Sequence, residues 1–88
     1  MNIQIISKEK TEDTLAIELL NDKTNAFIYY NKKMAYVNVI CRNASHAAYR
    51  GTGRDFPTWE AALSGYKSPA MKSMIEYAEG EAAAYFQN

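Results

Sequence analysis

The chain of 88 residues has little of the chemistry that most catalytic and metal sites use. It contains one cysteine, Cys41, and one histidine, His46. A lone cysteine cannot form a disulfide within the chain, and together the two residues cannot complete a Cys/His zinc site. On an extended strand their odd spacing would place them on opposite faces, which separates a thiolate from its base. No carboxylate pair stands beside a nucleophile, so we expect no enzyme activity, no metal and no cofactor.

Long apolar runs are missing as well. No segment approaches the roughly 18 consecutive apolar residues that a membrane-spanning helix requires. The first residues, MNIQIISKEKTEDT, lack the basic region and the apolar stretch of a secretion signal. We therefore expect a cytoplasmic protein with no membrane partner.

Acidic residues are absent from one long central part of the chain, although the net charge of the whole is zero. Residues 1–22 and residues 55–88 each carry two lysines against five acidic residues. Residues 23–54 carry six basic residues and no acidic residue. Charge blocks of this kind indicate interaction surfaces, provided that folding does not interleave them and cancel the field.

The first half of the chain has the apolar patterns of β-strands. Four segments either alternate between apolar and polar residues or are rich in Tyr, Phe, Val and Ile: residues 2–6, 14–20, 25–30 and 34–41. The polar residues 7–13 suit a hairpin loop, and residues 21–23 and 31–33 suit turns. Together these features predict a meander of four antiparallel strands.

The second half has helix signals. Residues 43–55 are small or polar and predict an irregular segment, which has room for a short fifth strand through residues 46–50. Thr58 suits the N-cap of a short helix. Ser68, followed by proline, suits the cap of a second helix that carries an apolar stripe as far as Tyr85.

These patterns predict one α+β domain over residues 1–88. It consists of a four-stranded antiparallel β-meander, with a possible short fifth strand, followed by two C-terminal helices packed on one sheet face. The predicted core residues are Leu15, Ile17, Val37, Val39, Trp59, Leu63, Met71 and Ile75. An open sheet of this kind leaves an edge or a face unpaired, and the expected surface is rich in tyrosine. We therefore expect a homodimer.

One face of the predicted sheet combines aromatic and basic side chains. If Val37 and Val39 face the helices, alternation puts a mixed set on the opposite face: Met34, Tyr36, Asn38, Ile40 and Arg42, with either Phe27 and Tyr29 or Ile28 and Tyr30. Single-stranded nucleic acid stacks its bases on such aromatic residues, while Lys and Arg neutralise its phosphates. The first hypothesis is a nucleic-acid-binding accessory protein. Its site residues would be Tyr29, Lys32, Lys33, Tyr36, Arg42, Arg50 and Arg54.

The second hypothesis is a protein-interaction or inhibitor module without catalysis. Tyrosines are common in strands for packing reasons, and Arg50 and Arg54 suit a carboxylate such as Asp55 or Glu60 as well as a phosphate. The sequence Gly-Thr-Gly-Arg at residues 51–54 lacks the rest of a phosphate-binding loop. In layout the fold resembles small single-strand-binding domains that dimerise through a helix. In size and style the chain resembles phage or plasmid accessory proteins that cover a host factor. No motif carries either resemblance, so single-stranded nucleic acid and a partner protein both stay open as partners.

Overall fold

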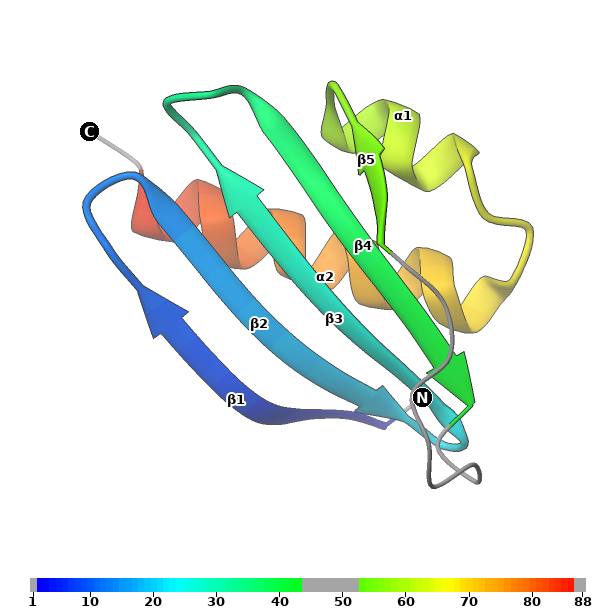
Figure 1. Cartoon of the computed structure of the whole chain (residues 1–88). Coiled ribbons are helices and arrows are strands. Elements are labelled where there is room, and N and C mark those ends of the chain that lie inside the picture. Colours follow the sequence, from blue (N-terminus) through cyan, green and yellow to red (C-terminus); the bar gives the residue numbers. More distant parts are fainter. Residues whose placement is uncertain (1, 44–52, 87–88) are drawn as a thin grey trace.

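The computed structural model describes residues 2–43 and 53–86, which form one antiparallel sheet with two helices on one of its faces (Figure 1). The strands lie in the sheet in chain order: β1 (Ile3–Lys10), β2 (Thr14–Asn21), β3 (Thr24–Asn31), β4 (Tyr36–Asn43) and β5 (Arg54–Phe56). The helices are α1 (Trp59–Ser64) and α2 (Pro69–Tyr85). The predicted α+β class, an antiparallel sheet followed by two C-terminal helices, is confirmed.

Strand β1 is longer than the sequence predicts, because residues 7–10 continue the strand instead of joining the loop. Ile3 is half-buried and every other residue of β1 is exposed. A strand at the edge of a sheet is held by backbone pairing to a single neighbour, so polar residues such as Lys8 do not interrupt it. The pairing with β2 shifts at Ile6, which is an extra residue in the register.

The fifth strand lies directly before the helices. Strand β5 pairs antiparallel with residues 37–39 of β4, and its last residue, Phe56, is buried on the helix side. The fifth strand that the sequence allowed at residues 46–50 falls outside the described residues. Strand β5 therefore extends the sheet by only three residues, and it leads straight into α1.

Two residues with left-handed backbone shape the hairpin turns. Asp22 has a φ of 56° between β2 and β3, and Ala35 has a φ of 58° at the end of the turn between β3 and β4. Asn31 supports the second turn, since its Oδ1 accepts a hydrogen bond from the Met34 N–H at 2.9 Å. Strand β4 consequently begins at Tyr36, so Met34 and Ala35 belong to the turn and not to the strand that the sequence predicts over residues 34–41.

The core lies between the sheet and the helices. Every second residue of β2 is buried, as the alternation predicts. The buried apolar residues are Leu15, Ile17, Leu19, Ala26, Ile28, Val37, Val39, Phe56, Ala62, Met71, Met74, Ile75, Ala78 and Ala82. Six of the eight predicted core residues are among them. The other two, Trp59 and Leu63, pack against the core but stay half-buried, because α1 is a short helix at the margin of this layer.

Both predicted helix starts are confirmed by hydrogen bonds. The Thr58 hydroxyl accepts from the Ala61 N–H at 3.0 Å, and the Ser68 hydroxyl accepts from the Met71 N–H at 3.3 Å. Each side chain thereby satisfies a backbone donor that the first turn of a helix leaves without a partner. The first cap fixes where α1 begins and so places Trp59 near the end of β3.

Candidate functional site

Successive residues of β3 point to opposite faces of the sheet, so its tyrosines belong to different surfaces. Ile28 and Tyr30 lie on the helix side, where Ile28 is buried, and Phe27 and Tyr29 lie on the other side. This register decides between the two sets of aromatic residues that the sequence left open. We call the sheet surface away from the helices the open face. Its described side chains include Glu9, Ala16, Glu18, Leu20, Phe27, Tyr29, Tyr36, Asn38, Ile40 and Asp55.

The centre of the open face is aromatic and apolar. Phe27 lies opposite Ile40 in the register, and its side chain is 37% exposed. The ring centroids of Tyr29 and Tyr36 are 5.9 Å apart and the rings are tilted by 47°. A large apolar side chain left exposed in the middle of a sheet adds to a surface patch of the kind that marks interaction sites.

The charged strand side chains that the structure describes on the open face are carboxylates. They belong to Glu9, Glu18 and Asp55. Asp55 Oδ1 accepts a hydrogen bond from Asn38 Nδ2 at 2.8 Å, and Glu18 Oε2 accepts one from Asn25 Nδ2 at 3.2 Å. Among the strand side chains that the structure describes, no lysine or arginine lies on this face.

Tyr36 is held in its neutral form on this face. Burial raises the pKa of the Tyr36 hydroxyl, and the neighbouring Tyr29 and Asp55 raise this pKa further. Tyr29 in turn accepts a hydrogen bond from Asn31 Nδ2 at 3.3 Å. The described centre of the open face therefore offers aromatic rings, amides and hydroxyl groups, with negative charge beside them.

Of the predicted aromatic and lysine residues of the site, the two tyrosines lie together and Lys32 lies apart from them. Tyr29 and Tyr36 are neighbours on the open face. Lys32 and Lys33 are exposed residues of the turn between β3 and β4. The Lys32 ammonium group lies 5.5 Å from the centre of the Phe86 ring, which places it toward the helix side of the sheet.

Of the predicted arginines, Arg54 is the one whose side chain the structure describes, and it lies away from the tyrosines. The guanidinium carbon of Arg54 lies 5.0 Å from the centre of the Phe56 ring and 4.9 Å from that of Tyr66, on the helix side. Its Nη1 donates a 2.9 Å hydrogen bond to the backbone carbonyl of Gly65, the C-cap residue of α1, and among the described residues it forms no ion pair with Asp55 or Glu60. The backbone of Arg42 belongs to β4, but its side chain lies outside the description, as does all of Arg50.

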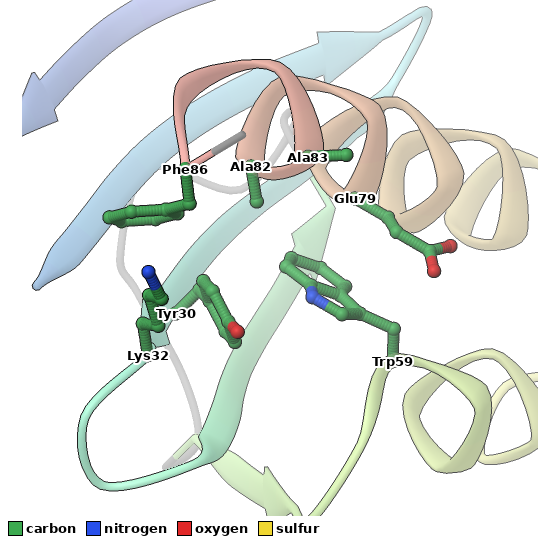
Figure 2. Close-up of a pocket in the computed structure, with 7 residues that line it drawn as sticks. All are labelled: Tyr30, Lys32, Trp59, Glu79, Ala82, Ala83 and Phe86. Atoms are coloured by element: carbon green, nitrogen blue, oxygen red, sulfur yellow. The ribbon is translucent and has the colours of Figure 1, made fainter. Parts of the chain in front are cut away.

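A second surface feature lies on the helix side, where a hollow of about 320 Å³ opens beside the end of α2 (Figure 2). We call it the aromatic hollow. It is lined by Tyr30, Lys32, Trp59, Glu79, Ala82, Ala83 and Phe86. The centroid of the Tyr30 ring is 5.2 Å from that of Trp59 and 5.7 Å from that of Phe86. The two alanines leave space that larger side chains would fill.

Several polar groups of the aromatic hollow make no ion pair or hydrogen bond to the described side chains. Among the described side chains, the Glu79 carboxylate has no ion pair, and the Trp59 indole N–H and the Tyr30 hydroxyl have no hydrogen-bond partner. Figure 2 shows Lys32 and Glu79 on opposite sides of the Tyr30 and Trp59 rings. The aromatic hollow therefore carries a positive group at one end, a negative group at the other, and aromatic rings between them.

Sequence reasoning did not find the aromatic hollow. It assigned Trp59 to the core and Lys32 to a phosphate-binding surface. The available signal was the spacing of Glu79, Ala83 and Phe86, which places the three residues on neighbouring turns of one helix. That spacing does not say which strand or turn the end of the helix meets.

Comparison of the chain with protein-family models, with curated proteins and with solved structures found no match. In residues 2–43 and 53–86, no group of three His, Cys, Asp or Glu side chains could hold a metal ion. The described helices include none that is long and apolar enough to span a membrane. Neighbouring atoms desolvate the Cys41 thiol and raise its pKa, although the residue is exposed. Function is therefore inferred from the open face and the aromatic hollow.

Proposed function

We propose that the protein is an interaction module that binds a partner protein through its open face. The observation that carries this proposal is the position of Phe27, which is 37% exposed, opposite Ile40 on the sheet face that the two helices do not cover, with the carboxylates of Glu18 and Asp55 on the same face. Aromatic side chains supply apolar area that leaves water on binding, and the carboxylates favour a positively charged partner. The expected partner is a protein surface or segment in which Lys or Arg stands next to apolar residues.

The arrangement of charges on the open face is less suited to binding a nucleic-acid strand. If its bases stacked on Tyr29, its phosphates would lie near the described carboxylates of the open-face strands. Phosphates and carboxylates carry the same sign of charge and repel each other. Lys32 lies against Phe86, and Arg54 lies against Phe56, both on the helix side. Neither contact supports a phosphate chain on the open face. Binding of single-stranded nucleic acid stays a prediction, and the titrations below test it.

The expected homodimer also stays a prediction. Two copies that met through their open faces would bring the carboxylates of Glu18 and Asp55 close to those of the other copy, which is unfavourable. Strand β1 is a long exposed edge and offers a second way to pair, although Lys8 on this edge opposes it. The expectation from the sequence requires light scattering at high micromolar concentration to return the mass of a dimer, despite these opposing charges. A monomer mass at that concentration contradicts the expectation.

Selection from a random peptide library, with the immobilised protein as bait, tests the proposed function. The selected peptides should be rich in Lys or Arg beside aromatic or aliphatic residues. Their affinity should fall about tenfold or more when Phe27→Ala replaces the wild type, since a central aromatic residue dominates such contacts. Peptides that lack basic residues, or that bind Phe27→Ala as tightly as the wild type, contradict the proposal.

Tyr77→Ala is the matched control. Tyr77 lies on α2 and is 36% exposed, against 37% for Phe27, so both changes remove a similarly exposed ring. Tyr77→Ala should leave peptide affinity unchanged.

A labelled single-stranded oligonucleotide is titrated in parallel at low and at higher salt. Binding that weakens steeply with salt and that requires Phe27 would assign the open face to nucleic acid instead.

A further inference from the structure

The aromatic hollow is a second candidate binding site, and it does not depend on the function proposed for the open face. Tyr30 is the only one of its lining residues that belongs to a strand, and its neighbour Tyr29 lies on the other side of the sheet. The lining residues come from β3, the turn after it, α1 and the end of α2. A substitution in the aromatic hollow can therefore be tested without changing the open face.

The shape and the lining favour an extended ligand over a compact one. Pockets that enclose small ligands are clefts of about 300–1,000 Å³ that bury most of the ligand. The aromatic hollow, at about 320 Å³, is at the bottom of that range and is open to solvent. The rings of Tyr30 and Trp59 are inclined to each other by 42° and form a shallow notch. A flat, rigid apolar group fits such a notch at little cost in conformational entropy.

The hydrogen-bond donors of Trp59 and Tyr30 indicate that the ligand should present acceptor groups. The Trp59 indole N–H can only donate a hydrogen bond, and the Tyr30 hydroxyl can donate one. Neither has a partner among the described side chains. A segment in the polyproline II conformation makes no internal hydrogen bonds, so its carbonyl groups are available to such donors. Aromatic grooves that combine stacked rings with donors of this kind are a recurring way to bind proline-rich segments.

The charges at the two ends of the aromatic hollow give the ligand a direction. Glu79 is half-buried and has no ion pair among the described side chains, so it favours a basic group. Lys32, on the other side of the rings, favours an acidic one. We propose that the aromatic hollow binds a proline-containing polypeptide segment in the polyproline II conformation, with a basic side chain at Glu79 and an acidic group at Lys32.

The direct test is a titration of the full chain with a synthetic peptide. The peptide contains a short run of prolines flanked by one arginine and one glutamate, and both chain orders are made. The control peptide has alanines in place of the prolines. Trp59 is the only tryptophan in the chain, so its fluorescence reports binding at the aromatic hollow. We expect a saturable change with the proline peptide in one of the two orders, and affinity for the alanine peptide lower by about tenfold or more.

Two variants locate the bound peptide. Glu79→Gln should lower affinity by roughly two- to fivefold for the arginine peptide, and should not change it for a peptide in which glutamine replaces that arginine. Ala83→Leu fills the space from an exposed position and should abolish binding without lowering the thermal midpoint. Phe27→Ala is the control on the open face and should bind the proline peptide like the wild type.

Several results would overturn the assignment. The first is equal affinity for the proline and alanine peptides, and the second is no saturable change at any concentration up to the millimolar range. The third is full binding by both Glu79→Gln and Ala83→Leu. If free tyrosine displaces the proline peptide and binds more tightly, the aromatic hollow takes a small flat ligand and the peptide proposal fails. Loss of the open-face interaction alone leaves all these readouts unchanged, so the two proposals fail separately.

Discussion

Tyr29 and Tyr30 are adjacent in β3 and contact different aromatic partners on the two sides of the sheet. The ring centroid of Tyr29 is 5.9 Å from that of Tyr36 on the open face, and the ring centroid of Tyr30 is 5.2 Å from that of Trp59 on the helix side. Single substitutions at these neighbouring positions should therefore have different consequences, one for binding and one for folding.

We expect Tyr30→Ala to lower the free energy of unfolding by about 2–3 kcal/mol, because Tyr30 packs against the core and its ring contacts two others. Tyr29→Ala should cost about 1 kcal/mol, since it removes a cross-strand pair at a half-exposed position. Urea denaturation followed by circular dichroism measures both. Equal losses for the two variants would mean that the open face contributes as much to folding as the helix side does.

The glycines of the two helices should respond in opposite ways to alanine. A Cβ added at Gly80 would have no atom within 4 Å, so Gly80→Ala should stabilise the protein by about 0.5–1 kcal/mol. A Cβ added at Gly65 would lie 2.6 Å from Phe56 Cε1, so Gly65→Ala should destabilise by about 1–3 kcal/mol. Thermal and urea unfolding of both variants check the signs. A stabilised Gly65→Ala would show that the Phe56 ring moves aside freely.

Glu18→Gln and Asp55→Asn remove charge from the open face while keeping size and an oxygen that can accept a hydrogen bond. Each should weaken a basic peptide selected on the wild type by roughly two- to fivefold and should make its binding less sensitive to salt. Fluorescence anisotropy at two ionic strengths measures this. Glu76→Gln, at an exposed position on α2, is the control and should change neither quantity. Stronger peptide binding by Glu18→Gln or Asp55→Asn would contradict the proposed role of the carboxylates.

The ion pair between β1 and α2 should make stability fall in the alkaline range. Lys8 Nζ lies 2.8 Å from Glu81 Oε1, and this hydrogen bond and charge raise the Lys8 pKa above its usual 10.5. The folded state then holds the proton more tightly than the unfolded state does. The stabilisation is complete below the unfolded pKa and is lost as pH rises through the folded one.

Thermal midpoints of the wild type and of Glu81→Gln, measured from neutral into alkaline pH, test this ion pair. The two profiles should converge as pH rises, because the wild type loses an interaction that the variant already lacks. The raised pKa of Tyr36 adds a loss in the same range, but it is common to both proteins. Profiles that stay parallel throughout would show that the ion pair does not contribute to stability.

Some elements could be predicted from the sequence because local rules determine them. Strand β2 buries one face completely, so its apolar residues must recur at every second position, and Leu15, Ile17 and Leu19 do. The hydroxyls of Thr58 and Ser68 each accept a hydrogen bond from the backbone N–H three residues further along the chain, so the helix starts could also be predicted from the sequence. Strand β1 was predicted too short because its polar residues are stabilised by backbone pairing at an edge.

The candidate site could not be predicted in the same way, because sheet neighbours come from different charge blocks. The residues between Lys23 and Arg54 include no acid in the sequence. In the sheet, β2 contributes Glu18 beside β3, and β5 contributes Asp55 beside β4. Folding thus puts carboxylates from both acidic blocks next to the acid-free block. Contacts between residues distant in the sequence likewise take Lys32 toward Phe86 and Arg54 toward Tyr66, away from the open face.

The most direct test of the proposed function is amide chemical-shift mapping on the isotope-labelled protein. A basic peptide from the library selection and a single-stranded oligonucleotide are titrated separately. With the peptide, we expect saturable shifts centred on Phe27, Tyr29 and Ile40, and with the oligonucleotide we expect none at these residues. Saturable oligonucleotide shifts at the same residues that weaken steeply with added salt would contradict the account and would make the open face a nucleic-acid surface.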